Sequence, residues 1–408
     1  MRGKGERIIM SIIFQDRLGN KEKLDAFPGE NISSVLLRYH IPLTSVITTL
    51  DDKPISEMSV LDPRKDYFVK LIEGYDIKSI ISAVFPNEST NLPYLKSRVV
   101  FDLDGSLIEQ HIPMECSDVV DMVEDSIRFA ISNYQMIDEG ETVLVGLSGG
   151  VDSSSLLIAL TKISREMNFK VVAATFEDFD SMSSPAFQNA QQLAKMLEVE
   201  HRLIPSNVIE EAFHLNKSLR SILPEMMETE YRSYAMYADH HTTRRALELF
   251  ADDIGADKIL LGLHTTDLIA GLINSYTTGY QMADMFKRKV GKYTYIYPLM
   301  FVPKKELHLY FYAHQQRYAV HTYPNSWELN PKDRNYYYYL ADQIQSLFPG
   351  IENYLFEAHS VQLKTSPKLN FTKCKNCGSH ILQQYNSDIG DGDCDVCRVF
   401  RELGYIDK

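Results

Sequence analysis

The sequence has no apolar run long enough to span a bilayer, which argues against transmembrane helices. Its first residues, MRGKGERIIMSIIF, also lack the long apolar core and the small-residue cleavage site of a secretory signal peptide. We therefore expect a cytoplasmic protein with no membrane partner.

An excess of positive charge is also missing. Lys and Arg number 42 against 55 Asp and Glu, which gives a formal net charge of −13. Because affinity for nucleic acids rests largely on cations that neutralise phosphates, this balance argues against a generic polyanion binder. It does not exclude a local basic patch. The segment FKRKVGKY carries such a cluster, which is either a contact for RNA phosphates or a solvated loop: Lys287, Arg288, Lys289 and Lys292.

Cysteine is scarce, and four of the five cysteines form two CxxC pairs. Sixteen residues separate Cys374/Cys377 from Cys394/Cys397, in CKNCGSHILQQYNSDIGDGDCDVC. This spacing lets two thiolate knuckles meet over one tetrahedral Zn²⁺, and four protein ligands leave no open position for catalysis. Two disulfides are the alternative, which a reducing compartment disfavours. We expect a structural zinc site, and we expect the isolated Cys116 to be a small buried hydrophobe.

Length and composition predict more than one domain. A chain of 408 residues with 44% hydrophobic residues is long enough for two or three domains and a sizeable core. The central part alternates strands with helices, which is typical of a doubly wound α/β domain with a parallel sheet. We divide the chain into a compact ββαββ unit (1–76), a linker (77–97), a hairpin with an acidic helix (98–138), the α/β core (139–365) and a zinc ribbon (366–408).

One segment of the core, TVLVGLSGGVDSSSLLIAL, changes character at its two glycines. A strand pattern ends there and a helical pattern begins, so the glycines lie where backbone amides and the positive end of a helix dipole can receive an anion. The hydroxyls of Ser148, Ser153 and Ser154 add donors, and Asp152 could hold Mg²⁺. The string fits neither GxxxxGK[ST] nor GxGxxG. A phosphate or pyrophosphate suits such a site; a plain turn is the alternative.

The string SGGVDSS after a buried strand resembles the signature of the PP-loop (N-type) ATP pyrophosphatases, which cleave ATP to AMP and pyrophosphate and adenylate an oxygen of their substrate. Residues 90–400 are similar to one branch of them, the tRNA 2-thiolation enzymes. The similarity lies in GETVLVGLSGGVDSSSLL, RRALELFADDIGADKILLGLHTTDL, YPLMFVPKKELHLY and FPGIENYLFEAH ahead of the zinc ribbon.

The resemblance assigns roles to particular residues. It implies that the ATP phosphates and Mg²⁺ lie at Ser148, Gly149, Gly150, Asp152, Ser153 and Ser154, and adenosine at Ala174 and Phe176. It further implies that Arg244 faces the α-phosphate, where a guanidinium would stabilise developing charge, and that His264 and Asp267 close the site. A surface helix charge is the alternative for Arg244, and a helix N-terminal cap is the alternative for Asp267.

The N-terminal unit resembles the β-grasp (ubiquitin-like) sulfur carriers. Those carriers end in a free Gly-Gly tail, whereas this unit continues through EGYDIKSIISAVF without a diglycine. We therefore predict a tethered recognition or docking module, to which a partner protein could bind.

The chain departs from the thiolation branch at its cysteines. The three positions that hold an iron–sulfur cluster or perform sulfur chemistry fall at Tyr237, His240 and Tyr323, so we expect no iron–sulfur cluster. Adjacent His240 and His241 point about 100° apart on a helix and make a poor chelate. Where this chain reads HTTDL, the family motif has a second aspartate, and Leu268 occupies that position. Cys116 is the one relic of an N-terminal zinc finger, whose first pair falls at Asn91 and Tyr94.

Three functions follow from these features. The leading hypothesis is an adenylating enzyme that activates a tRNA base or a small-molecule carbonyl; sulfur would then come from a separate carrier. The second is the same activation followed by attack of an amine. The third is a nucleotide-binding partner subunit with little turnover, which docks through the N-terminal unit. Relatives of this kind are often homodimers.

Overall fold

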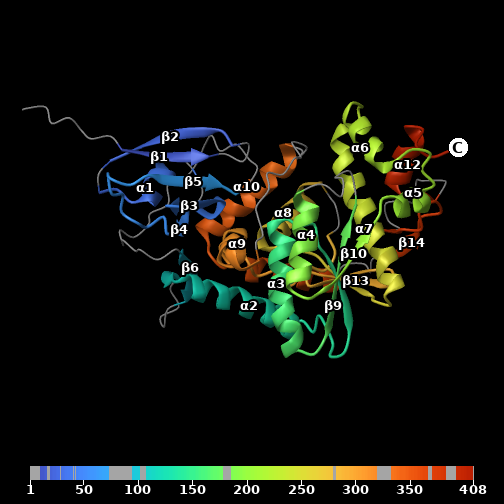
Figure 1. The fold of residues 1–408 in the computed structure, drawn as a ribbon, viewed down its shortest axis with the longest axis horizontal. Helices are drawn as coiled ribbons and strands as arrows, with labels where there is room; N and C mark the ends of the chain where they lie inside the picture. The colour runs from blue at the N-terminus through green and yellow to red at the C-terminus, as the bar shows by residue number, and fades with distance from the viewer. Residues whose placement is uncertain are drawn as a thin grey trace, which may run out of the picture.

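The computed structural model covers the whole chain, and the structure describes residues 10–15, 19–27, 29–39, 41, 43–72, 94–101, 107–177, 185–278, 282–318, 332–365, 370–382 and 392–407. Within these ranges, no helix combines the length and apolar character needed to cross a membrane. The chain forms an N-terminal sheet, a hairpin, a central α/β layer structure and a small C-terminal ribbon (Figure 1).

The N-terminal unit is a five-stranded mixed sheet with one helix across it. Its strands are β1 (Met10–Gln15), β2 (Lys21–Ala26), β3 (Val46–Leu50), β4 (Lys53–Ile55) and β5 (Tyr67–Leu71), in the order β2-β1-β5-β3-β4, with β1 parallel to β5. Asn31 caps α1 (Ile32–Arg38) by accepting from the Ser34 amide at 2.9 Å. Ile32, Val35 and Leu36 of α1 are buried in the core of this unit. Its assignment to the β-grasp class stays a prediction.

A long hairpin and helix follow. β6 (Tyr94–Phe101) and β7 (Leu107–Met114) pair antiparallel, and α2 (Cys116–Asn133) comes directly after them. The hairpin begins at Tyr94, inside the segment predicted as linker, because Tyr94 already pairs with Met114. Most of that linker (77–93) lies outside the described residues, and so does Asp104-Gly105, where the sequence predicts the turn of the hairpin. Cys116 is exposed at the first position of α2, so the prediction of a buried cysteine was wrong.

The central sheet confirms the expected α/β class. Its order is β10-β9-β8-β11-β13-β12, parallel except for the edge pair β12/β13. The strands are β8 (Thr142–Gly146), β9 (Lys170–Phe176), β10 (Glu200–Ile204), β11 (Lys258–Leu260), β12 (Lys287–Val290) and β13 (Tyr293–Ile296). Figure 1 shows α3 (Val151–Glu166) and α4 (Pro185–Met196) on one side of these strands and α7 (Ala235–Asp253) on the other.

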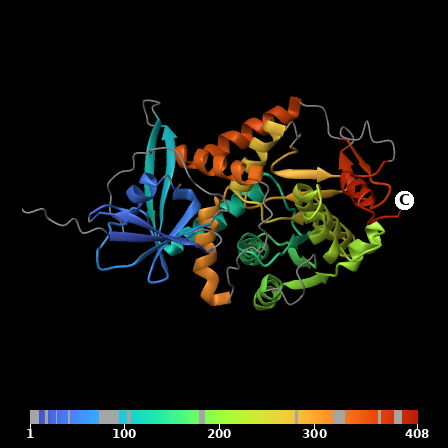
Figure 2. The ribbon, with the colours of Figure 1, turned by 90° about the horizontal axis from the view of Figure 1, so that it is seen from above.

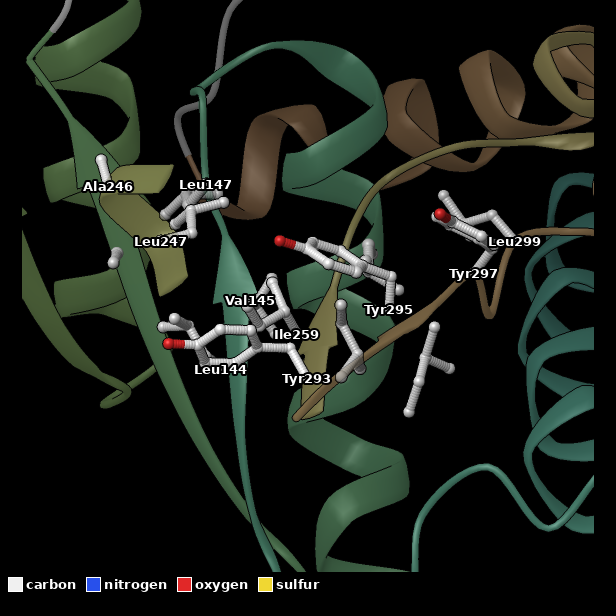
Figure 3. Packing of buried hydrophobic residues seen from close by; sticks show 14 of the residues in the cluster. Leu144, Val145, Leu147, Ala246, Leu247, Ile259, Tyr293, Tyr295, Tyr297 and Leu299 are labelled. Atoms are coloured by element: carbon white, nitrogen blue, oxygen red, sulfur yellow. The ribbon is translucent and has the colours of Figure 1, made fainter. Parts of the chain in front are cut away.

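The core of the sheet is apolar on both faces, as parallel strands covered by helices require. Leu144 and Val145 of β8 and Ile259 of β11 are fully buried, and the rings of Tyr293 and Tyr295 fill the space beside them (Figure 3). Helix α2 is tied to α3 by an ion pair of 2.6 Å between Glu124 and Lys162.

The sequence predicts one long helical stretch around 226–255, and the structure divides this region. α5 (Asn207–Phe213) and α6 (Leu219–Met227) precede a 3₁₀ turn at Arg232–Tyr234, and only then does α7 begin. The Thr229 hydroxyl donates to the Met226 carbonyl at 2.8 Å and accepts from the Tyr231 amide at 3.1 Å. This side-chain bonding takes groups that a continuous helix would need, so α6 ends there.

Four further helices pack against other helices of the core, and the ribbon follows them in the chain. They are α8 (Thr265–Thr278), α9 (Lys304–Tyr318), α10 (Lys332–Leu347) and α11 (Ile351–Thr365), followed by β14 (Phe371–Lys373), β15 (His380–Leu382) and α12 (Asp395–Glu402). Figure 2 shows the ribbon at the end of the molecule opposite the N-terminal sheet.

Candidate nucleotide site and metal centre

The loop between β8 and α3 is held by its own serines. The Ser153 hydroxyl accepts from the Ser148 amide at 3.1 Å and lies 3.0 Å from the Ser148 hydroxyl. Ser148 Oγ also accepts from the Gly150 amide at 3.4 Å. Ser148 and Gly150 are exposed, whereas Ser153 is buried beneath them. The loop therefore has a fixed shape with an open rim.

Gly149 is required by its surroundings. Its φ of +80° lies in the left-handed region, and a Cβ there would stand 1.9 Å from the Ala186 carbonyl oxygen in the first turn of α4. The Asn189 side chain donates to the Gly149 carbonyl at 2.7 Å. Helix α4 thus fixes the middle of the loop, through a residue, Asn189, that no sequence motif indicates.

Helix α3 presents its N-terminus at the same loop. Gly150 is its N-cap in extended conformation, and Asp152, Ser153 and Ser154 occupy its first turn. The Ser154 hydroxyl is buried without a hydrogen-bond partner among the described residues. A 16-residue helix has free amides and partial positive charge at this end, so an anion is stabilised there.

The end of β9 lies beside the loop, since the Leu147 amide donates to the Ala174 carbonyl at 2.8 Å. The Ala174 side chain is buried and that of Phe176 is partly buried at the last position of the strand. The structure therefore places both predicted adenosine contacts at the carboxyl edge of the strand next to β8. Thr175 faces the other way and donates to the Leu147 carbonyl at 2.6 Å.

The segment between β11 and α8 crosses the start of α3. A Cβ on Gly262 would lie 2.9 Å from the Ser153 amide nitrogen, so this backbone passes in close contact with the helix N-terminus. His264 and Asp267 follow two and five residues later. The structure thus brings the predicted closing motif, His264 and Asp267, beside the SGGVDSS loop, although the motif and the loop are more than 100 residues apart in sequence.

Asp267 is bonded through both carboxylate oxygens. Oδ2 accepts from the His264 amide at 3.0 Å, which caps α8, and Oδ1 accepts from the Tyr338 hydroxyl at 2.5 Å. Burial would raise the pKa of Asp267, but the charges of His264 and Lys304 and these hydrogen bonds together lower it. Asp267 is therefore ionised, and the helix-cap role weighed from the sequence is present in the structure.

Arg244 is directed to other groups than the loop. Its guanidinium lies 3.5 Å from the buried carboxylate of Glu248, and it donates to the His380 carbonyl at 3.3 Å. One of its nitrogens is also 3.3 Å from the His241 ring. These contacts join α7 to the ribbon, and the predicted role of Arg244 at the α-phosphate stays a prediction.

The four ribbon cysteines converge as predicted. The Sγ atoms of Cys374, Cys377, Cys394 and Cys397 all lie within 4.8 Å of one another and are buried. The Cys394 amide donates to Cys374 Sγ at 3.2 Å and the Asn376 side chain donates to Cys397 Sγ at 3.4 Å. Donors aimed at sulfur stabilise thiolates, and four convergent thiolates form a tetrahedral set that suits Zn²⁺.

The ribbon is fastened to the core through α7. Arg245 donates to the Cys377 carbonyl at 3.0 Å, and His241 Nε2 lies 3.5 Å from Cys394 Sγ. Burial lowers the pKa of His241, and the positive charge of Arg244 lowers it further, although hydrogen bonding to Cys377 acts in the opposite direction. His241 is therefore packed between α7 and the ribbon, whereas His240 is exposed.

Two of the three missing-thiol positions lie on α7, where Tyr237 is 52% exposed and His240, one turn away, is also exposed. Leu268, at the place of the family's second aspartate, is buried in α8. Tyr323 lies outside the described residues.

The basic cluster forms the edge hairpin β12/β13. Lys287 donates to the Gln135 carbonyl at 2.5 Å, and Lys292 pairs with Asp252 at 2.5 Å. Both cations therefore stabilise the fold itself, and a contact with RNA phosphates stays a prediction.

Comparisons with known proteins agree with this geometry. The family model described as a PP-loop domain matches residues 122–326. A tRNA-cytidine(32) 2-sulfurtransferase of Actinobacillus succinogenes is 26% identical over 249 residues, which cover 55% of this chain and 70% of that protein. The enzyme of the same name from Chromobacterium violaceum is 30% identical over 185 residues, covering 44% of this chain and 53% of its own length. The chain thus spans about 70% of the length of the first relative and about half of the length of the second.

A solved structure supports the fold. The U34-tRNA thiolase NcsA from Methanococcus maripaludis with its [4Fe-4S] cluster superposes with a TM-score of 0.52 and 15% identity, covering 72% of this chain and 92% of that one. At this identity the likeness concerns the fold alone.

Proposed function

The chain belongs to the PP-loop family, and on that premise we propose that it is an ATP-dependent adenylating enzyme that prepares a tRNA base for 2-thiolation. The observation that carries the proposal is the loop of residues 148–154, fixed by Asn189 and set against the segment that leads to His264. The two curated relatives described above, both named as tRNA-cytidine(32) 2-sulfurtransferases, support a tRNA base as the acceptor.

The proposed reaction has two steps. An oxygen of the base attacks the α-phosphorus of ATP, the bond from that phosphorus to the bridging oxygen breaks, and pyrophosphate leaves. A sulfur nucleophile, held as the thiocarboxylate of a carrier, then attacks the adenylated carbon, and the carbon–oxygen bond breaks with release of AMP. Water cleaves the acyl–sulfur bond that remains, which leaves the 2-thio base and the carrier's carboxylate. Four of the five cysteines lie in the ribbon and Cys116 is exposed on α2, so the sulfur nucleophile is assigned to a separate carrier.

Each residue near the loop has a proposed part. The loop glycines and serines bind the β- and γ-phosphates through amides and hydroxyls at the α3 N-terminus. Mg²⁺, when bound beside Asp152, would neutralise phosphate charge. Ala174 and Phe176 border the adenosine, and ionised Asp267 holds the α8 N-terminus with His264 at the edge of the site.

The experiment is ATP turnover with α- and γ-labelled nucleotide and Mg²⁺, with and without total tRNA. We expect AMP and pyrophosphate, stimulated by tRNA and lost in Asp152→Ala. The control is Asp121→Ala, which removes an exposed carboxylate on α2. ADP and phosphate, or tight ATP binding without turnover, would contradict the proposal and favour a partner subunit. Turnover indifferent to tRNA would replace the tRNA base by a small-molecule acceptor.

We propose structural Zn²⁺ for the ribbon. Zn–S bonds of about 2.3 Å in a tetrahedron place the sulfurs roughly 3.8 Å apart, and the Cys374–Cys397 and Cys377–Cys394 sulfurs are both 3.8 Å apart. A cube of four irons and four sulfides between the thiolates would need wider spacing, which supports zinc over a cluster. Metal analysis of the aerobically and anaerobically purified protein tests this: one zinc per chain is expected, and iron with an absorption band near 400 nm would overturn it.

A further inference from the structure

The N-terminal unit contacts the core through two helices, α9 and α10 (Figure 1). Glu57 and Lys305 form an ion pair of 2.6 Å, and both side chains are buried. Thr44 Oγ1 donates to the Asp342 carbonyl at 3.2 Å, and the neighbouring Ser45 hydroxyl donates to the Asp342 carboxylate at 3.3 Å. Buried polar pairs of this kind fix one docking geometry, because any other would leave their charges and donors unpaired.

The same helix α10 contacts the nucleotide site. Tyr338, one turn before Asp342, donates to Asp267 at 2.5 Å. Gln345, near the end of α10, donates to the Thr266 hydroxyl at 3.1 Å. Residues 266 and 267 form the first turn of α8, which directly follows the backbone that touches α3 at Gly262. One helix therefore bonds the N-terminal unit at one side and the closing motif at the other.

Helix α9 provides a second connection. Lys305 binds Glu57 of the N-terminal unit and donates to the Leu43 carbonyl at 3.2 Å. Lys304, its neighbour in the chain, is close enough to Asp267 for its charge to favour the ionised carboxylate. Both helices that contact the N-terminal unit thus also interact with Asp267, α10 through the Tyr338 hydroxyl and α9 through the charge of Lys304.

We propose that Tyr338 is a positioning residue that acts through Asp267 to hold the β11–α8 segment against the SGGVDSS loop, and that the N-terminal unit keeps α10 in place for this contact. The unit would then be a structural part of the nucleotide site, in addition to any partner that it binds. The effect on ATP rests on the proposed function; the effect on the β11–α8 segment does not.

The first test compares Tyr338→Phe with Tyr336→Phe in the full chain. Tyr336 is exposed on the same helix and is the matched control. For Tyr338→Phe, we expect hydrogen exchange of residues 262–268 to rise about tenfold without nucleotide, and the KM for ATP to rise about tenfold with kcat changed less than twofold, since one hydrogen bond to a carboxylate is lost. A general loss of stability would instead raise exchange throughout the sheet. Unchanged exchange at 262–268 would overturn the proposal.

The second test addresses the N-terminal unit. Thr44→Val combined with Ser45→Ala removes the hydroxyls that bond α10 while keeping similar volume; Arg64→Ala, in an exposed turn of the unit, is the control. Faster exchange in both 338–346 and 262–268 is expected, whereas loosening of α10 alone would refute the role of the unit. If the wild-type protein fails to bind ATP, the proposed function fails, and the exchange measurements still decide this inference.

Discussion

The Asn189 side-chain amide donates to the Gly149 carbonyl at 2.7 Å, and Asn189 is almost completely buried when it does so. Because the peptide unit is planar and trans, turning this carbonyl toward α4 turns the Gly150 amide the other way, where it lies 3.4 Å from Ser148 Oγ. Asn189, 40 positions after Gly149 in the chain, thus sets which of the loop amides face the open rim.

Replacing Asn189 by alanine should weaken ATP·Mg²⁺ binding about 5- to 150-fold, because an unpaired buried carbonyl costs about 1–3 kcal/mol and the loop can relieve that cost by turning. Titration calorimetry with a non-hydrolysable ATP analogue measures it. Gln192→Ala, on the exposed side of the same helix, should have no effect. Equal affinity in both variants would show that α4 does not shape the loop.

Substituting Gly262 by alanine should abolish ATP binding while the protein stays folded. The new Cβ would be 2.9 Å from the Ser153 amide nitrogen and 3.0 Å from the Asp152 carbonyl carbon, and neither is a flexible side chain that can give way. The α3 N-terminus must therefore shift. In the control Gly271→Ala, the nearest atom is the terminal methyl of Met282 at 3.2 Å, so binding should persist. Nucleotide binding by the Gly262 variant, with normal circular dichroism, would contradict this close approach.

The parts of the site that could be predicted from sequence are those made by neighbours in the chain. The turn, the helix start and the hydroxyls of SGGVDSS all come from adjacent residues, and so do the two thiolates of each CxxC pair. Asn189 and Tyr338 could not be found in this way. Asn189 lies in an ordinary amphipathic helix and Tyr338 in a run of four tyrosines, and their partners, Gly149 and Asp267, are 40 and 71 residues away.

Arg244 illustrates the opposite case. Its place as the first residue of the pair Arg244-Arg245 suggests a catalytic cation, but a helix position does not reveal which neighbour the side chain faces. Only the packing of the ribbon on α7 brings the His380 carbonyl to it. The strand pattern of the N-terminal unit likewise predicts that it is a separate unit. Its contact with α9 and α10 could not be predicted, because it depends on pairs such as Glu57–Lys305, which are 248 residues apart.

Loss of the proposed ribbon zinc should loosen α7 as well as the ribbon. Cys377→Ser is expected to lose zinc, to lower the melting temperature and to increase hydrogen exchange around residues 241–245, because Arg245 donates to the Cys377 carbonyl. Cys116→Ser is the matched control, since that thiol is exposed on α2 and should leave zinc content unchanged. Retention of zinc by the Cys377 variant would argue against the four-thiolate site.

Breaking the buried ion pair between the N-terminal unit and α9 should be costly. Glu57→Gln leaves the Lys305 ammonium buried without its counter-charge, which typically costs about 3–5 kcal/mol. The double variant Glu57→Gln, Lys305→Met should recover much of this loss in urea denaturation. Asp62→Asn, which breaks the exposed pair with Arg64, should change the free energy of unfolding by less than about 1 kcal/mol. A similar small effect of Glu57→Gln would contradict the buried pair.

His308 should give the stability of the protein a pH dependence below neutrality. Burial lowers the pKa of His308 well below its usual 6.5, and the positive charges of Lys304, His264 and Lys70 lower it further. Between the folded pKa and 6.5, the unfolded chain binds a proton that the folded chain does not. The free energy of unfolding is therefore unaffected by His308 above pH 6.5 and decreases as the pH falls below 6.5. The slope from this one group approaches about 1.4 kcal/mol per pH unit.

Urea denaturation between pH 7.5 and 5.5 should show that His308→Gln flattens the slope, while His240→Gln, at an exposed position, leaves it as in the wild type. A slope identical in wild type and His308→Gln would mean that the His308 ring takes up its proton in the folded state as readily as in the unfolded one.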